Sequence, residues 1–125
     1  MVSHNLGLVA EDLGDLQRAG DLYRESVPLF RDAGYRAHLP FVLEGFVTLA
    51  ARQGHAERAL ILAGAAALVR EQIDSPIPPA LKPRLDQAIA RARQELGPAA
   101  DEAWAGGQGM TLDKAIAYAL EEDQA

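Results

Sequence analysis

Residues 13–23, LGDLQRAGDLY, and residues 53–63, QGHAERALILA, carry one pattern at two places, forty positions apart. In each stretch a glycine precedes a polar residue, two further residues and an Arg-Ala pair, so Gly14 and Ala19 correspond to Gly54 and Ala59. Glycine commonly ends a helix, and a small residue one turn into the next helix lets two helices approach closely. The pattern therefore predicts two helix hairpins, each with a glycine-containing turn, that form a structural repeat.

Helical spacing of apolar residues continues on both sides of these turns, between glycine and proline breakers. Residues 40–54 are apolar on most sides and should form the most buried helix, whereas Pro28 should bend the preceding helix without breaking it. β-Branched residues are sparse, which argues against strands. We expect an all-α chain of about seven helices, over residues 3–13, 15–33, 40–54, 56–73 and 81–96, a short stretch from Pro98 that carries Trp104, and a last helix capped by Thr111.

The length of 125 residues predicts a single domain, residues 1–125. Hydrophobic residues make up 49% of the chain but aromatic residues only 6%, so leucine, alanine, valine and isoleucine must fill the core. Residues 74–79, DSPIPP, should form a rigid connector because proline restricts both itself and its predecessor. The domain would then consist of two hairpins over residues 1–73, this connector, and a C-terminal helical cap over residues 80–125.

The first repeat unit resembles the tetratricopeptide (TPR) family. The Leu-Gly, turn, small and aromatic positions of that family are occupied by Leu6-Gly7, Gly14-Asp15, Ala19 and Tyr23. The second unit departs from the family at Phe46-Val47, His55 and Ala63, and its spacing of 40 residues exceeds the usual 34. The resemblance implies antiparallel helix hairpins stacked as a short right-handed TPR-like solenoid, with a longer second helix or loop in the first unit.

The second half resembles the C-terminal region of large bacterial transcriptional regulators. These are LuxR-type and antibiotic-regulatory-type proteins with a signal-transduction ATPase core, and related cyclase-linked ATPases. The resemblance is carried by an alanine-rich helix with a Pro-Pro linker, residues 58–79, and by LGPAADEAWAGGQGMTLDKAIAYAL, residues 96–120. It implies an interaction portion of such a regulator, because the chain has no GxxxxGK[ST] loop for ATP and no basic helix-turn-helix for DNA.

The glycine-rich segment GGQG, residues 106–109, raises the question of a phosphate-binding loop. Such a loop needs a preceding strand and a following lysine and hydroxyl in a fixed arrangement. Here a helical pattern precedes the glycines, and Asp113 places a negative charge in the first turn of the next helix. We therefore interpret the segment as a hinge between two helices.

Other residues capable of chemistry are not spaced as a site requires. His4, His38 and His55 lack the helical pair spacing of metal ligands. Acidic pairs are adjacent in sequence, so their side chains point in different directions on a helix. No serine lies in a Gly-x-Ser-x-Gly elbow. We expect neither an enzyme nor a cofactor or metal site.

The charge of the chain bears on its partners. A formal net charge of −6 and a pI of about 4.9 argue against nucleic-acid binding, which needs a basic stripe. The sequence contains no cysteine, and no apolar run approaches the ~20 residues of a membrane span. We expect a cytoplasmic chain with no direct nucleic-acid contact and no membrane contact.

A protein partner is the remaining expectation. In TPR arrays the first helix of each hairpin lines a concave groove, which in this chain would be formed by His4, Leu8, Glu11, Asp12, Glu44, Thr48 and Arg52. The N-terminal helix should leave part of an apolar face uncovered, with Leu6, Val9 and Leu13 as contributors. Capping of that face by a second copy would give a homodimer.

These expectations lead to a non-catalytic protein–protein interaction or scaffold domain. The alternative is a small-molecule sensor with an apolar pocket between the fourth helix and the last three, lined in part by Trp104. A filled core with an exposed apolar face would favour the scaffold, and a cavity with convergent polar groups would favour the sensor. A third interpretation is a fragment of a longer regulator without a function of its own.

Overall fold

The computed structural model describes residues 2–32 and 36–121, and it describes side chains over residues 6–31 and 37–121. The α-helices are α1 (Val2–Asp12), α2 (Leu16–Asp32), α3 (Leu39–Arg52), α4 (Ala56–Gln72), α5 (Lys82–Leu96), α6 (Ala100–Gln108) and α7 (Leu112–Leu120). Single 3-10 turns, η1 (Arg36–His38) and η2 (Gly97–Ala99), precede α3 and α6. The described residues contain no strand, so the predicted all-α class is confirmed.

The two repeated turns have the same backbone geometry. Gly14 and Gly54 adopt φ angles of 84° and 82°, a left-handed conformation that side chains disfavour. The amide of the following residue donates to the carbonyl five residues back, from Asp15 to Ala10 at 2.9 Å and from His55 to Ala50 at 2.8 Å. This is the Schellman arrangement that ends a helix and satisfies its last carbonyls. The hairpin turns predicted from the repeat are therefore present at both positions.

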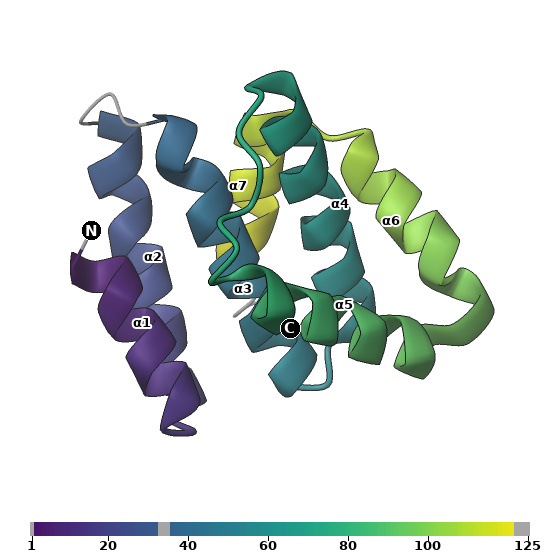
Figure 1. Ribbon diagram of the computed structural model, residues 1–125, viewed down its shortest axis with the longest axis horizontal. Coiled ribbons are helices and arrows are strands. Elements are labelled where there is room, and N and C mark those ends of the chain that lie inside the picture. The colour runs from purple at the N-terminus through teal and green to yellow at the C-terminus, as the bar shows by residue number, and fades with distance from the viewer. Residues whose placement is uncertain (1, 33–35, 122–125) are drawn as a thin grey trace.

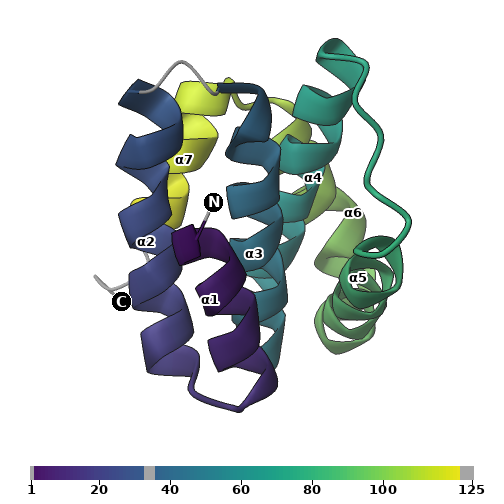
Figure 2. The same cartoon turned by 60° about the vertical axis from the view of Figure 1, so that its left-hand side comes forward.

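The helices are arranged around α3. The α1–α2 hairpin lies at one end of the molecule and α6 at the other, with α3 and α4 between them (Figure 1). Helix α5 lies across one side of α3 and α4, while α7 contacts them from the opposite side (Figure 1 and Figure 2). All of α3 is buried except Phe41 and Arg52, as expected for the central helix.

Helix α2 continues through Pro28, which is exposed, so the predicted continuity of this helix is confirmed. The buried side of α2 includes Ala19, Leu22, Tyr23, Ser26 and Phe30, which recur at helical spacing. The helix predicted over residues 56–73 ends one residue earlier, because Ile73 follows the last turn of α4 and is 40% exposed.

The glycine-rich segment is not the hinge that its sequence predicts. Gly106 and Gly107 belong to α6, and the chain turns only at residues 109–111. A Cβ atom on Gly107 would lie 1.9 Å from the carbonyl oxygen of Ile61, and one on Gly64 would lie 2.3 Å from the carbonyl oxygen of Trp104. These two glycines therefore let the backbones of α4 and α6 meet directly. The predicted helix cap is confirmed, since the amide of Lys114 donates to Thr111 Oγ1 at 3.1 Å.

No helix in the described residues is both long and apolar enough to cross a membrane. The buried and apolar α3, for example, has only 14 residues.

Candidate functional site

Three residues of the predicted groove are buried in the structure. Glu11, Glu44 and Thr48 are 1%, 8% and 4% exposed, so they are buried where an open, partner-facing surface was expected. The expectation is wrong for Glu44 and Thr48 because α5 and the connector before it pack over this side of α3. It is wrong for Glu11 because this side chain points between α1, α2 and α3, where it meets Tyr23 and Thr48. A polar side chain on the face of a hairpin becomes interior when a later helix covers that face.

The other predicted groove residues lie nearer the edge. Leu8 is half-buried, and Asp12 and Arg52 are exposed. The guanidinium of Arg84 on α5 forms a hydrogen-bonded ion pair with Asp12, and the Arg52 guanidinium donates to the backbone carbonyl of Glu11. Both contacts tie α1 to its neighbours. The side chain of His4 lies outside the described residues.

Glu11 is the acceptor at the centre of a buried polar cluster that joins α1, α2 and α3. The Tyr23 hydroxyl donates to Glu11 Oε2 at 2.6 Å, and Thr48 Oγ1 lies 3.0 Å from the same oxygen. Burial raises the pKa of Glu11 above its ordinary value of 4.5, against the opposing effects of these hydrogen bonds and of nearby arginines. Burial and the neighbouring Glu11 carboxylate also raise the pKa of Tyr23, which therefore remains a donor. The cluster can orient α1, but no side chain in it reaches an open surface where a substrate could react.

Glu44 belongs to a second buried contact. Its carboxylate accepts two hydrogen bonds from Arg70, from Nε at 2.5 Å and from Nη2 at 2.7 Å. Arg70 Nη1 donates to the carbonyl oxygens of Ser75 and Pro76, and the guanidinium lies 4.7 Å from the centre of the Phe41 ring. This bidentate pair holds the proline-rich connector against α3 and α4. Arg70 could not be predicted from the sequence, because nothing local distinguishes a buried arginine from a solvated one.

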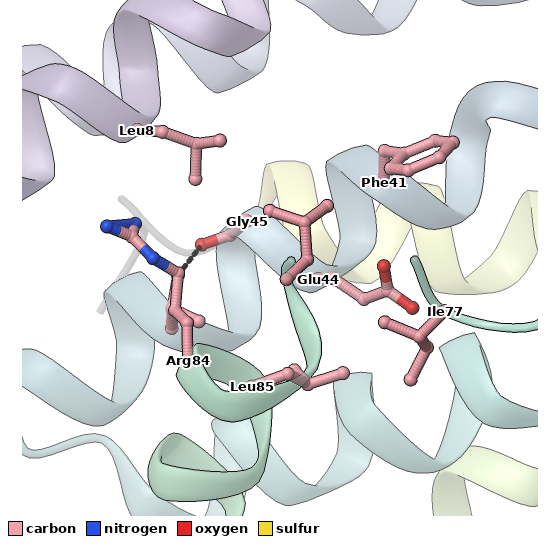
Figure 3. Close-up of a pocket in the computed structure, with 9 residues that line it drawn as sticks. Leu8, Phe41, Glu44, Gly45, Ile77, Arg84 and Leu85 are labelled. Carbon is pink, nitrogen blue, oxygen red and sulfur yellow. Dashed lines mark hydrogen bonds between the residues drawn. The ribbon is translucent and has the colours of Figure 1, made fainter. Parts of the chain in front are cut away.

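A small cavity remains between α1, α3 and α5 (Figure 3). It has a volume of about 20 Å³, which is room for one water molecule but not for a metabolite. In Figure 3, Leu8 and Arg84 lie toward one side, and the Glu44 carboxylate lies toward Phe41 and Ile77 on the other. The complete lining consists of Leu8, Phe41, Glu44, Gly45, Thr48, Ile77, Leu81, Arg84 and Leu85.

A larger depression lies at the start of α4, beside the ends of α5 and α7. It is an open hollow of about 540 Å³ lined by Gly54, His55, Ala56, Glu57, Arg58, Leu96, Tyr118 and Glu121. Arg58 already donates to the backbone carbonyls of Tyr118 at 3.2 Å and Ala119 at 2.5 Å, so it caps the C-terminal end of α7. Trp104, which the sensor alternative would place in the wall of an apolar pocket, does not line this hollow, and its ring centre lies 5.5 Å from the Arg93 guanidinium.

The outer side of α1 carries an uncovered apolar surface. Leu6, Val9 and Leu13, here named the outer α1 stripe, are 47%, 52% and 80% exposed. On the opposite side of the same helix, Glu11 is buried. The prediction that these three residues are left uncovered is confirmed.

The space that holds the Tyr23 ring is another feature that was not predicted from the sequence. A Cβ atom on Gly7 would lie 2.5 Å from a ring carbon of Tyr23, and one on Gly45 would lie 2.9 Å from the same carbon. The ring therefore occupies space that two glycines on neighbouring helices leave free. An isolated glycine inside the otherwise apolar α3 was the available signal for this contact.

Metal chemistry has no support in the described residues, which contain no group of three histidine, cysteine, aspartate or glutamate side chains close enough to hold an ion. No protein-family model matches the chain, and neither a curated protein nor a solved structure matches it significantly. The functional argument therefore depends on the contacts and surfaces of the chain itself.

Proposed function

We propose that this chain is a non-catalytic helical interaction domain whose contact surface is the outer α1 stripe. The single observation that carries the proposal is the exposure of Leu6 and Val9 on α1 and of Leu13 directly after it, at 47%, 52% and 80%, while the other side of the helix is already packed. A helix with apolar residues on both sides is normally buried on both sides. Adjacent exposed apolar residues are typical of a surface that another protein covers.

The repeated turns support a TPR-like solenoid as the scaffold. Gly14 and Gly54 end equivalent helices with equivalent hydrogen bonds, and the small residues Ala19 and Ala59 are both buried one turn later. The extra helix α5 on one side of α3 and α4 departs from a simple stack of hairpins. The resemblance of residues 58–79 and 96–120 to bacterial regulators supports a role as the interaction part of a cytoplasmic transcriptional regulator.

The first test separates an interaction surface from a folding surface. In a variant with Leu6→Gln, Val9→Gln and Leu13→Gln, unfolding in urea is measured at a protein concentration low enough that the unmodified chain has the mass of one copy, so that association does not contribute. The free energy of unfolding should then change by no more than about 0.5 kcal/mol per substitution, because glutamine favours helix and the sites are exposed. The control is Leu43→Ala in the fully buried part of α3, which should cost about 2–5 kcal/mol. A stripe variant as destabilised as this control would show that the stripe serves the fold and would refute the proposal.

Neither of the two hollows described above supports the sensor as a second candidate function. The cavity beneath α5 holds about one water, and the larger depression beside α7 is open, with its arginine already bonded to backbone carbonyls.

A further inference from the structure

We infer that the partner of the outer α1 stripe is a second copy of this chain, whose own α1 packs antiparallel against it. This inference rests on the proposed function of the stripe as a contact surface. It adds the identity of the partner and the direction of the two helices.

The spacing of the stripe is that of a helix–helix seam. Leu6, Val9 and Leu13 are separated by three and four residues, the alternation found along the seam of paired helices. The sequence extends this alternation to Val2, four residues before Leu6. The side chains of two such seams can interdigitate along the length of both helices. A single exposed apolar residue would instead fit only one pocket on a partner.

The charge of the stripe is compatible with self-association. The chain has a formal charge of −6, so most of its surface would repel a second copy. The two acidic residues in α1 are not part of the stripe, because Glu11 is buried on the opposite side of the helix and Asp12 is paired with Arg84. Two copies can therefore bring their stripes together without placing unpaired carboxylates opposite each other.

The ends of α1 favour the antiparallel direction. The N-terminal end of a helix carries a partial positive charge and the C-terminal end a partial negative charge. No acidic residue lies in the first turn of α1 and no basic residue in its last turn, so neither partial charge is compensated within the helix. Antiparallel packing places each negative end beside the positive end of the other copy, while parallel packing would bring the two negative ends together.

A two-fold axis through the middle of the seam gives this arrangement a measurable geometry. The axis would pass midway between Leu6 and Val9, so Val9 lies opposite Leu6 of the second copy. At 1.5 Å rise per residue, the two copies of Val9 would be offset along the helices by roughly 4.5 Å and the two copies of Leu13 by roughly 16 Å. Only residues near the axis can then form a disulfide with their own counterparts.

Single-cysteine variants can measure this directly, because the chain contains no cysteine. We compare Val9→Cys and Leu13→Cys with Gln94→Cys, an exposed position on α5 that reports chance collisions. Under mild oxidation, the Val9→Cys variant should form covalent dimers at least ten times faster than the other two. Equal rates for Val9→Cys and Leu13→Cys would indicate parallel packing and overturn the inference, as would a Val9→Cys rate no higher than that of Gln94→Cys.

Light scattering over a concentration series gives an independent measurement on the unmodified chain. Its mass should rise from one copy towards two with concentration, and the variant with glutamine at Leu6, Val9 and Leu13 should keep the mass of one copy. A constant one-copy mass for the unmodified chain would overturn the second-copy inference. That result would leave the interaction domain to be judged by the urea experiment, so the failures of the two proposals are distinguishable.

Discussion

Replacing Gly107 with alanine should destabilise the protein, although alanine is the better helix former. The added Cβ atom would lie 1.9 Å from the carbonyl oxygen of Ile61 and 2.8 Å from the amide nitrogen of Ala65, both in the backbone of α4. Ordinary contact begins near 3.4 Å, so α6 must move away by about 1.5 Å. A backbone cannot rotate aside as a flexible side chain can.

The magnitude follows from three effects. Overpacking at a tight contact costs about 3 kcal/mol. Separation of the helices also weakens the 2.7 Å hydrogen bond from Gln108 Nε2 to the Gly64 carbonyl, which is worth about 1 kcal/mol. The preference of helices for alanine over glycine offsets about 1 kcal/mol of this loss. The Gly107→Ala variant should therefore lose about 3 kcal/mol of unfolding free energy.

The neighbouring glycine is the matched control. Gly106 lies in the same helix, but a Cβ atom there would meet nothing within 4 Å. The Gly106→Ala variant should therefore gain about 1 kcal/mol from helix propensity alone. Urea unfolding followed by circular dichroism measures both variants. Equal stabilities would refute the direct contact of α4 with α6 and would restore the interpretation of this segment as a hinge.

Three further predictions concern the buried polar contacts and one helix cap. Because burial raises the pKa of Glu11, the stability linked to this group is fully present below pH 4.5 and is lost as pH rises through the higher folded-state pKa. In urea titrations between pH 4.5 and 8, the unfolding free energy of the Glu11→Gln variant should therefore rise relative to that of the unmodified chain. A difference between the two that does not change with pH would contradict the effect of burial on Glu11. Glu44→Gln should cost about 3 kcal/mol by leaving Arg70 without its counter-charge; a loss below about 1 kcal/mol in the same assay would argue against a buried pair. Thr111→Ala should cost about 1 kcal/mol through loss of the α7 cap, measured by thermal unfolding against Thr111→Ser, which keeps the hydroxyl.

Several helix boundaries could be predicted because their causes lie within a few residues. Gly14 and Gly54 end helices through their own backbone conformation, and Thr111 begins α7 through a bond to an amide three residues away. The burial of α3 could also be predicted, since an apolar residue on every side leaves a helix no face for water. The exposure of Leu6, Val9 and Leu13 could also be predicted, because α1 has more apolar surface than one hairpin partner can cover.

The buried state of Glu11, Glu44 and Thr48 could not be predicted in this way. The TPR resemblance places these residues on an open groove. The burial of Glu44 and Thr48 depends on α5, which follows the connector and packs over α3 from a distant part of the chain, and the burial of Glu11 depends on how closely α1 packs against α2 and α3. Only the tertiary structure shows which face of a hairpin a later helix will cover.

The helical class, the positions of the repeated turns and the exposed apolar side of α1 follow from the sequence, because each depends on backbone conformation, capping or periodicity within one or two helices. The contact made by Gly107 and the interior position of Glu11, Glu44 and Thr48 follow instead from how the helices pack. Both outcomes are set by how closely two distant segments approach, and the local sequence contains no measure of that distance.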